Sequence, residues 1–295
     1  MRGLQCKLSV FLLALAHMSS PEASPLGRPV AYPESPDARV LFPIARAQSR
    51  SELALDARVL PFTGVDVWNA YELSWLDARG KPCVAVAELR VPCESPNLIE
   101  SKSLKLYLNG YAQTRFDDAQ TLRTAIACDL SDAAGARVEV DLVEARDFAA
   151  QRIVELPGAS LDEQELDVRD YGPPQPDHLH AQMHARQVEE ALTTQLFRSN
   201  CPVTGQPDWA SLQIRYAGAP IEHAGLLRYL VSYRTHCGFH EACVERIFMD
   251  ITARCAPRAL SVYARFTRRG GLDINPWRAT PGFGAMPPNL RGARQ

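Results

Sequence analysis

Two stretches of this sequence share one pattern at an offset of 122 residues: IESKSLKLYLNGY at 99–111 and IEHAGLLRYLVSY at 221–233. Their shared leucines and tyrosines recur at the three- and four-residue spacing of an amphipathic helix. The same offset carries Val138 and Val140 onto Leu260 and Val262. A repeat that holds over roughly forty residues predicts two homologous modules in one chain.

A second similarity precedes each copy. At an offset of 141, Pro61, Thr63, Gly64 and Trp68 fall on Pro202, Thr204, Gly205 and Trp209. Alternating apolar residues indicate strands over 68–75, 84–89, 138–143, 212–216 and 260–266, and helical spacing marks 104–111, 183–196 and 243–251. Each module is therefore expected to run strand, strand, helix, helix, strand, strand, which gives an α+β fold.

The chain is expected to divide into four parts. Residues 1–58 form a leader and a Pro-rich extended arm, 59–159 the first module, 160–199 a linker that contains a helix, and 200–295 the second module. Within the leader, Arg2, Lys7 and the apolar stretch 8–16 fit a secretory signal, and Met18 is an alternative start. We interpret residues 1–17 as extraneous.

Composition excludes several classes of protein. The 295 residues are 46% apolar and 22% charged, which is typical of a globular chain with a sizeable core. Lys and Arg (32) nearly balance Asp and Glu (34), so no basic field is available to hold nucleic acid. No apolar run reaches the roughly 18 residues of a membrane span. The cysteines after the leader are odd in number, which favours reduced thiols and a cytoplasmic protein.

Cys201 is the strongest candidate nucleophile. It begins the turn-rich segment CPVTGQPD at 201–208, which is expected to follow a helix and to expose its side chains. A free thiol is only a few per cent ionised at neutral pH, so a reactive cysteine needs a nearby base, and Asp208 is the candidate. The alternative, a buried apolar cysteine, conflicts with these polar surroundings. We give that interpretation to Cys237, Cys243 and Cys255.

The two copies differ in the groups that carry chemistry. At the offsets given above, Cys201, Asp208, His240 and Glu241 of the second copy stand where the first has Leu60, Val67, Asp118 and Ala119. Conversely, Ser101 and Lys102 beside Glu100 are replaced by His223 and Ala224 beside Glu222. These complementary losses predict one composite site built from both modules.

The usual metal and nucleotide motifs do not occur in the sequence. Cys201, Cys237 and Cys243 form no Cys-x2-Cys pair, and His180 and His184 lack the intervening Glu of zinc proteases, so no metal is expected. Neither a Gly-x-Gly-x-x-Gly fingerprint nor a P-loop is found. Lys102, Lys105 and the run RRGG at 268–271 are candidates for phosphate contacts, with a solvated surface as the alternative.

The octapeptide ESKSLKLY, residues 100–107, matches throughout the motif that marks the QueF family, the NADPH-dependent 7-cyano-7-deazaguanine reductases. The segments 201–208, 239–241 and 268–277 also resemble blocks of this family, and the similarity extends from about Leu26 to residue 295. Because the motif precedes Cys201 and lies in the other module, the chain resembles the two-module subtype. Nothing in the leader resembles the family.

This resemblance implies the tunnelling fold, or T-fold, in which ββααββ modules join antiparallel strands side by side with helices outside. It also implies a homodimer. The family reduces the nitrile of 7-cyano-7-deazaguanine to a primary amine, consuming two NADPH per substrate, on the route to queuosine in tRNA. No direct contact with nucleic acid or membrane is expected.

The resemblance also implies roles for individual residues. Cys201 would add to the nitrile carbon and form a covalent thioimide, and Asp208 would donate and accept protons. The residues that would hold the base are Ile99, Glu100, Ser101, His240 and Glu241. Those that would contact NADPH are Ser101, Lys102, Arg269 and Gly270.

Three other interpretations remain. The chain could be another tunnelling-fold enzyme, such as a GTP cyclohydrolase, in which cysteine and histidine bind zinc. It could also be a noncatalytic deazapurine or purine binder whose Cys201 senses redox state. A secreted disulfide protein would instead be processed after Ala16 and have no free thiols.

Overall fold

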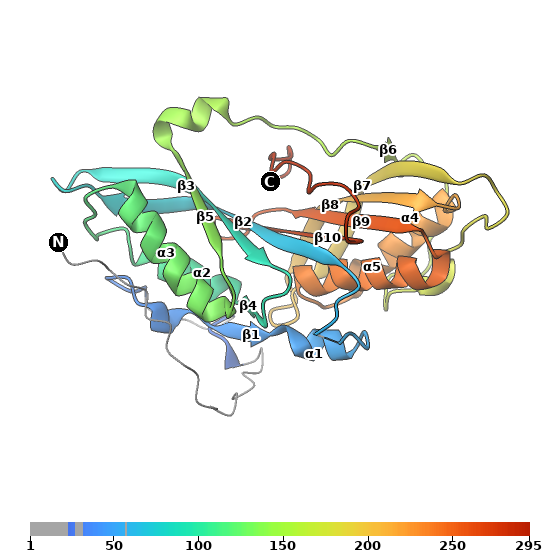
Figure 1. Cartoon of the computed structure of the whole chain (residues 1–295), viewed down its shortest axis with the longest axis horizontal. Helices are drawn as coiled ribbons and strands as arrows, with labels where there is room; N and C mark the ends of the chain where they lie inside the picture. Colours follow the sequence, from blue (N-terminus) through green and yellow to red (C-terminus); the bar gives the residue numbers. More distant parts are fainter. Residues whose placement is uncertain (1–22, 27–31, 57) are drawn as a thin grey trace.

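The protein is described by a computed structural model over residues 23–26, 32–56 and 58–295, so the leader predicted at 1–17 lies outside the described residues. One eight-stranded sheet runs the length of the molecule in the order β5-β3-β2-β10-β9-β8-β7-β6 (Figure 1). Its strands are β2 (Thr63–Leu76), β3 (Pro82–Pro92), β5 (Glu139–Glu144), β6 (Ala159–Ser160), β7 (Val188–Asn200), β8 (Pro207–Gly218), β9 (Ala259–Phe266) and β10 (Leu272–Ala279). Every pairing is antiparallel except the short contact of β6 with β7.

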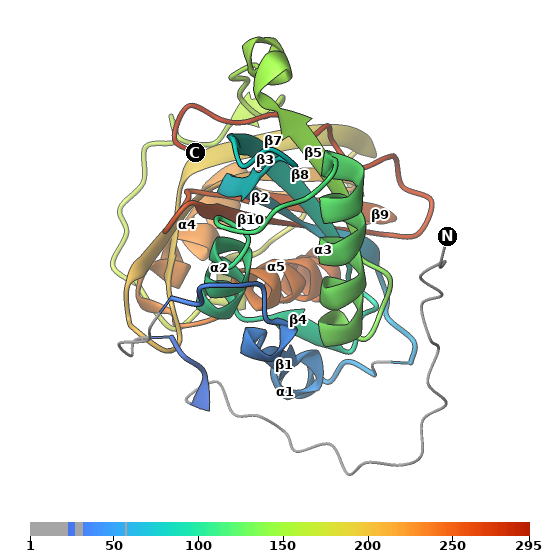
Figure 2. The ribbon, with the colours of Figure 1, turned by 90° about the vertical axis from the view of Figure 1, so that its left-hand side faces the viewer.

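The longer helices cover one face of this sheet, as Figures 1 and 2 show. They are α2 (Ser101–Asn109), α3 (Ala119–Ala134), α4 (His223–Val231) and α5 (His240–Cys255). Two apolar cores lie between helices and sheet, one in each half of the sheet. The predicted α+β class is therefore confirmed. Within the described part of the chain, no helix is long and apolar enough to cross a membrane.

The repeat predicted from the sequence is present in three dimensions. The order β2-β3-α2-α3-β5 recurs as β7-β8-α4-α5-β9. In each copy the two tyrosine hydroxyls of the repeated stretch bond to each other, and the first of them also donates to an aspartate on the next α-helix. These residues are Tyr107, Tyr111 and Asp129 in the first copy, and Tyr229, Tyr233 and Asp250 in the second. These buried hydroxyl chains fix the angle between the paired helices, because each polar group has its partner only in that arrangement.

In the eight-stranded sheet the first module has one strand fewer than predicted, because its β4 (Asn97–Ile99) pairs with the arm instead. After β5 the chain leaves the sheet, passes through a 3-10 turn at Ala145–Ala150 and crosses the molecule to β6 (Figure 1). The segment must connect β5 at one edge of the sheet with β7 near the other, so it serves as a crossover. In the second module β10 supplies the fourth strand, and it joins the modules by pairing with β2.

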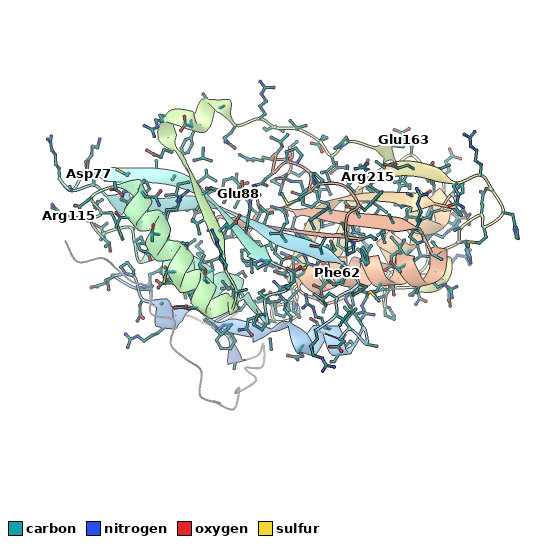
Figure 3. The ribbon with its side chains drawn as sticks, in the orientation of Figure 1. Phe62, Asp77, Glu88, Arg115, Glu163 and Arg215 are labelled. Carbon is teal, nitrogen blue, oxygen red and sulfur yellow. The ribbon has the colours of Figure 1, made fainter. Side chains whose placement is uncertain are left out.

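The predicted similarity at offset 141 is wrong. Trp68 lies in β2, the first strand of its module, whereas Trp209 lies in β8, the second strand. The β-bulges show which strands of the two modules correspond. They fall between Ala70 and Leu73 in β2 and between Thr194 and Phe197 in β7, so β2 corresponds to β7 at an offset of 124. The counterpart of the Cys201 loop is therefore the turn of the β2–β3 hairpin. Asp77 lies in that turn, and Figure 3 shows it at the outer end of the molecule.

Two further predictions in the connecting segments are wrong. The linker 160–199 contains no α-helix, and its second half is β7. Of the residues that suggested helical spacing, Met183 is 57% and Leu196 45% exposed, and the β-bulge after Thr194 breaks the alternation that would have revealed a strand. The arm is not simply extended, because it includes β1 (Pro43–Ala45), which pairs with β4 (Asn97–Ile99), and helix α1 (Arg46–Ser51).

The ends of α3 and α5 allow a stability prediction. Helix α3 is followed by Gly135 (φ 72°), and α5 by Ala256 (φ 44°), both in the left-handed region. An alanine in that region is roughly 1–2 kcal/mol less favourable than a glycine. A glycine loses more conformational entropy on folding, which offsets part of this difference. We expect Ala256→Gly to raise the free energy of unfolding by about 0.5–1 kcal/mol. Urea denaturation measures this, and an unchanged midpoint would contradict it.

Candidate active site

Cys201 lies in the loop that joins β7 to β8. Its backbone N–H donates to the Gln206 carbonyl (2.8 Å), and its carbonyl accepts from the Gly205 N–H (3.0 Å). Gly205 has φ +68°, a conformation that favours glycine at this turn. The preceding residue, Asn200, bonds through its backbone to His236 and Gly238, just before α5. The loop therefore holds Cys201 against the start of α5, where the side chain is buried, not exposed as predicted, and lines a cavity.

Asp208 lies at the start of β8 between two basic side chains. Its Oδ2 is 3.3 Å from His240 Nε2, and its Oδ1 is 3.1 Å from Arg269 Nη1. The His240 ring stacks on Phe266, with 3.9 Å between the ring centroids. Neither nitrogen of His240 nor Arg269 Nη1 makes a well-oriented hydrogen bond, although all three atoms are buried. His240 Nε2 and Arg269 Nη1 already face the Asp208 carboxylate, so His240 Nδ1 is the atom of the three that remains available to a ligand.

Glu100 comes from the first module and forms the N-cap of α2. Its carboxylate accepts from the backbone N–H groups of Lys102 (2.7 Å) and Ser103 (2.8 Å). Burial raises the pKa of this carboxyl, and the two N–H donors oppose that rise. Glu222, the counterpart in the second module, makes no such cap. The carboxylate of Glu100 thus holds the first turn of α2, and Glu100 itself lines the cavity.

Glu241 lies in the first turn of α5 and is 3% exposed. Burial raises the pKa of its carboxyl and nearby Asp66 raises it further, whereas Arg46 and His240 lower it. The negative charge is also favoured by the helix N-terminus. A carboxylate in this position can accept hydrogen bonds from N–H donors of a ligand.

Two adjoining cavities contain all the predicted site residues. The first is lined by Ile99, Glu100, Ser101, Cys201, Asp208, His240, Glu241 and Arg269. The second is lined by Ser101, Lys102, Arg269 and Gly270, together with Lys105. Ser101, His240 and Arg269 border both cavities. Residues from both modules therefore meet at one place, as the sequence predicted, although the pairing of Cys201 and Asp208 with Leu60 and Val67 at offset 141, on which part of that prediction rested, is wrong.

Several other lining residues were not predicted. Leu98, Pro202 and Phe239 are sequence neighbours of predicted residues, and that adjacency was the available signal. Trp68 and Ile274 face each other across β2 and β10, and only the folded sheet brings them to the cavity.

The second cavity fits a ligand that carries phosphates. Lys102, Lys105 and Arg269 supply positive charge, and charge-assisted bonds to phosphate are among the stronger ones in proteins. Gly270 has φ +58°, and a Cβ at that position would lie 3.2 Å from Lys105 Nζ. A larger residue there would therefore crowd the lysine. Arg269 lies at the border of the two cavities, where its Nη1 faces the Asp208 carboxylate at 3.1 Å.

The other cysteines are less suited to act as nucleophiles. Burial raises the pKa of the thiols of Cys93 and Cys243 to about 12 and that of Cys255 to about 11, so these thiols stay protonated near neutral pH. Cys237 is exposed, contrary to the prediction that it is buried. Among the described residues, no group of three or more His, Cys, Asp or Glu side chains could hold a metal ion.

The fold has two modules, and the site combines a buried cysteine with a neighbouring cavity that basic side chains line. Residues 32–142 match the family described as nitrile reductase, 7-cyano-7-deazaguanine-reductase N-term, and residues 207–282 match the QueF-like protein family. The chain therefore belongs to the NADPH-dependent 7-cyano-7-deazaguanine reductases, a family of nitrile reductases and hence oxidoreductases.

Two curated relatives support this membership. The chain is 56% identical to the NADPH-dependent 7-cyano-7-deazaguanine reductase of Stenotrophomonas maltophilia, over 94% of this chain and 100% of the relative. It is 57% identical to the reductase of the same name from Bordetella avium, over 92% and 98% of the two chains. The apo crystal structure of an archaeosine synthase, QueF-Like, is 18% identical, with a TM-score of 0.29, over 33% of this chain and 96% of that one.

Proposed function

We propose that this chain reduces the nitrile of 7-cyano-7-deazaguanine to an aminomethyl group through a covalent intermediate on Cys201. The observation that carries the proposal is the meeting of Cys201, Asp208 and Glu241 around one buried cavity. Reduction of a nitrile to a primary amine takes four electrons, and NADPH supplies them as one hydride in each of two rounds.

Cys201 makes the nitrile reducible. A nitrile is a weak hydride acceptor, and addition of the thiol across its triple bond forms a C–S bond and leaves a C=N bond that is more electrophilic. The thiol proton ends on the nitrile nitrogen, so atoms and charge balance in this step. After the first reduction, the C–S bond breaks, the thiol is restored and an imine remains for the second reduction. The buried position of Cys201 keeps water from hydrolysing these species.

Asp208 is the group that moves the proton. As a carboxylate it accepts the thiol proton, and as the neutral acid it donates to the nitrile nitrogen. Arg269 and His240 lie within 3.3 Å of its two oxygens and so fix the orientation of the carboxyl group. Fixed geometry of this kind is what a proton-transfer group requires, because transfer falls off steeply with distance.

The deazapurine ring would be held by groups from both modules. Glu241 faces the cavity with a carboxylate that accepts from the ring and amino N–H donors of a guanine-like base. His240 stacks on Phe266 and presents its unsatisfied ring Nδ1. From the first module, Glu100 and the backbone that it positions form the facing wall. Ser101, Lys102, Arg269 and Gly270 would contact NADPH in the second cavity.

An adduct measurement tests this function directly. Purified protein is mixed with 7-cyano-7-deazaguanine in the absence of NADPH, and its intact mass and absorbance are recorded. We expect a mass increase equal to that of the nitrile, mapped by peptide digestion to Cys201. Addition of NADPH should then consume two equivalents per substrate and release the protein at its original mass. Absence of both adduct and NADPH consumption would reject the proposal.

The wider assignments also belong to this proposal. We infer that the reaction is a step in the biosynthesis of queuosine for tRNA. We also infer that the enzyme is a cytoplasmic homodimer that makes no direct contact with nucleic acid. In support, no disulfide joins any of the seven described cysteines, and the chemistry depends on NADPH and a reduced thiol. Light scattering of the purified protein would measure the dimer.

A further inference from the structure

Three arginine side chains surround the indole of Trp209 in β8. The guanidinium carbons of Arg198, Arg234 and Arg294 lie 5.3, 5.4 and 5.9 Å from the centroid of its ring. They come from three separate segments, which are β7, the 3-10 turn at Ser232–Thr235 and the C-terminal segment after β10. The fold therefore gathers three positive charges at one aromatic ring, and we call this group the arginine cluster.

The arginine cluster lies on the face of the sheet opposite to the active site. Side chains alternate between the two faces along a strand, so Asp208 faces the first cavity and Trp209 faces away from it. Arg198 is the direct partner of Trp209 in the β7–β8 pairing and shares its face. The C-terminal segment that carries Arg294 crosses the face away from the helices (Figure 1). None of these cluster residues lines either cavity of the active site.

The positive charges of the arginine cluster have no carboxylate partner in the described ranges of the chain. Asp208, the acid adjacent to Trp209, already faces two basic side chains on the other side of the sheet. Glu155, near the C-terminal segment, accepts from the side chain of Gln195 (2.8 Å) and from the Ala293 N–H (3.1 Å). Like charges held close together repel each other, so an anion bound between them would be stabilised.

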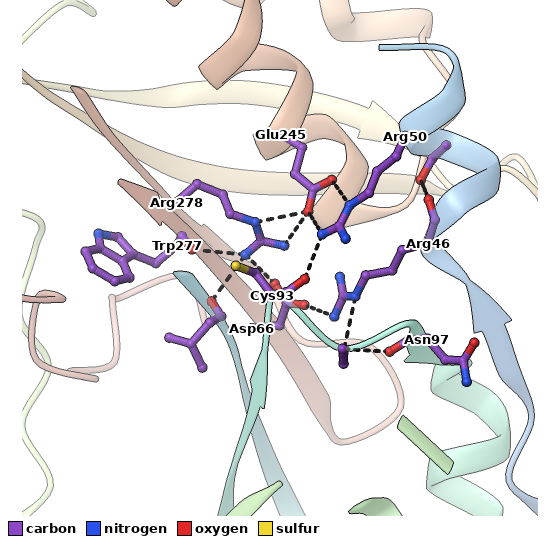
Figure 4. Close-up of polar contacts among 11 residues, drawn as sticks. Arg46, Arg50, Asp66, Cys93, Asn97, Glu245, Trp277 and Arg278 are labelled. Atoms are coloured by element: carbon purple, nitrogen blue, oxygen red, sulfur yellow. Dashed lines mark hydrogen bonds and ion pairs between the residues drawn. The ribbon is translucent and has the colours of Figure 1, made fainter. Parts of the chain in front are cut away.

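A second group of three arginines shows how such charges are balanced elsewhere in this chain. Arg46, Arg50 and Arg278 are buried where the modules meet. Each of them pairs with Asp66 or Glu245, at distances between 2.5 and 2.9 Å (Figure 4). The arginine cluster at Trp209 has no such acids, although two of its three arginines are half-buried. A partly buried guanidinium without a counter-charge is costly, so this charge is left for an external anion to balance.

Most N–H donors of the arginine cluster have no acceptor in the described structure. Arg198 donates once, to Asn200 Oδ1 (3.2 Å), and its Nε is buried without a partner. Arg294 donates once, to the Gln195 carbonyl (2.6 Å). The side chain of Arg234 makes no hydrogen bond to a described residue. Guanidinium groups bind phosphate oxygens through paired N–H donors, so these donors suit a phosphate group.

We propose that Arg198, Arg234 and Arg294 form a binding site for a phosphate-bearing small molecule on the face of the sheet opposite to the active site. A phosphomonoester carries about 1.5 to 2 negative charges at pH 7, so one or two phosphate groups would neutralise the three guanidinium groups. Two sources share this chemistry, a free phosphate compound and the phosphate groups of NADPH. The site goes beyond the reaction assigned to Cys201, because none of the steps described for that reaction uses the arginine cluster.

Binding of pyrophosphate tests the site. Calorimetric titration at constant ionic strength compares the wild type with Arg234→Met, which removes a guanidinium that has only the ring contact. Loss of one charged hydrogen-bonding partner should raise Kd for pyrophosphate at least about tenfold. Arg198→Met should have an effect of similar size, and it provides the test if Arg234→Met does not fold.

Arg215→Met is the matched control. Arg215 also lies in β8 and packs over a ring, that of Phe283 (5.2 Å), but it pairs with Glu189 (2.5 Å). This substitution changes the net charge by the same amount, and Kd for pyrophosphate should stay within about twofold of the wild type, because salt screens distant exposed charges. The second cavity is intact in all these proteins, so pyrophosphate bound there cancels in the comparison.

Tryptophan fluorescence reports binding at the arginine cluster itself. Pyrophosphate should change the emission of the wild-type protein, because neutralising the guanidinium groups alters the charge beside the indole of Trp209. Trp209→Phe keeps an aromatic ring and should lose this change in emission while it still binds pyrophosphate in the calorimeter.

The outcomes separate the proposal from its alternatives. It would be overturned if the wild type did not bind pyrophosphate, or if both arginine variants bound it as tightly as the wild type with the same change in emission. KM for NADPH identifies the source of the phosphate. A rise in Arg234→Met that matches the rise in Kd would assign the site to the cofactor, and an unchanged KM would assign it to a separate phosphate compound. The binding comparison does not depend on nitrile reduction, so failure of the proposed function would leave its result intact.

Discussion

Replacement of Cys201 by alanine is expected to abolish both the covalent adduct and turnover. Without the thiol no C–S bond can form, and the nitrile remains a weak hydride acceptor in an otherwise intact cavity. Loss of an essential nucleophile lowers rates by factors of at least about a thousand. Intact-mass analysis should show unmodified protein, and NADPH oxidation should fall to background. Substrate should still bind, because Glu241 and His240 remain in place.

Cys255→Ala is the matched control. Cys255 is also buried, but burial raises the pKa of its thiol to about 11 and it lines neither cavity. We expect the control to keep both the adduct and the wild-type rate. If Cys201→Ala kept full turnover, a noncovalent mechanism would have to replace the one proposed. If the wild-type protein bound the nitrile but neither protein turned it over, the chain would be a deazapurine binder.

The repeated helices could be predicted because their signal is local. Each copy has leucines and tyrosines at helical spacing, and the structure uses them as the apolar face of α2 and α4. The same positions supply the hydroxyl pair that binds Asp129 in one module and Asp250 in the other. A pattern that serves both packing and hydrogen bonding tolerates little change, so the offset of 122 remained visible in the sequence.

It was harder to predict which strand of one module corresponds to which strand of the other, because the sequence pattern of a strand is less distinctive than that of a helix. In β7 the bulge after Thr194 shifts the buried face by one residue, so Leu192 and Phe197 are buried while Leu196 is exposed. Four-residue spacing of Val188, Leu192 and Leu196 then imitated a helix. The offset of 141 compared turn residues, proline, threonine and glycine, that recur in unrelated loops. Strand pairing in the folded sheet corrected both.

The composite nature of the site was predicted, but its internal contacts were not. Chain positions alone do not show that Arg269 and His240 approach the same carboxylate, since Asp208 is far from both in sequence. They also do not show why one of two related hairpins carries the nucleophile. The β2–β3 hairpin ends at the outer end of the molecule, whereas the β7–β8 hairpin meets α5 and the first module (Figures 1 and 3). Only the second hairpin therefore meets a partner module within this chain.

Asp208→Asn is expected to slow both adduct formation and turnover by roughly a hundredfold or more, the usual contribution of a proton-transfer group. Asparagine keeps the shape of aspartate and can accept a hydrogen bond from Arg269, but it cannot take the thiol proton or return it to the nitrile nitrogen. Substrate affinity should change little, because the groups assigned to the base are untouched. Stopped-flow measurement of the adduct, followed by steady-state NADPH oxidation, separates the two steps.

Asp250→Asn is the matched control for Asp208→Asn. Asp250 binds the Tyr229 hydroxyl (2.6 Å) and lines neither cavity, so Asp250→Asn should keep the wild-type rates of both steps. An Asp208→Asn variant with normal adduct formation but slow turnover would restrict Asp208 to the protonations that follow reduction. An unchanged rate in both steps would leave His240 as the remaining proton-transfer group, since its ring faces Asp208 across the same cavity. The two measured rates therefore decide which proton Asp208 carries.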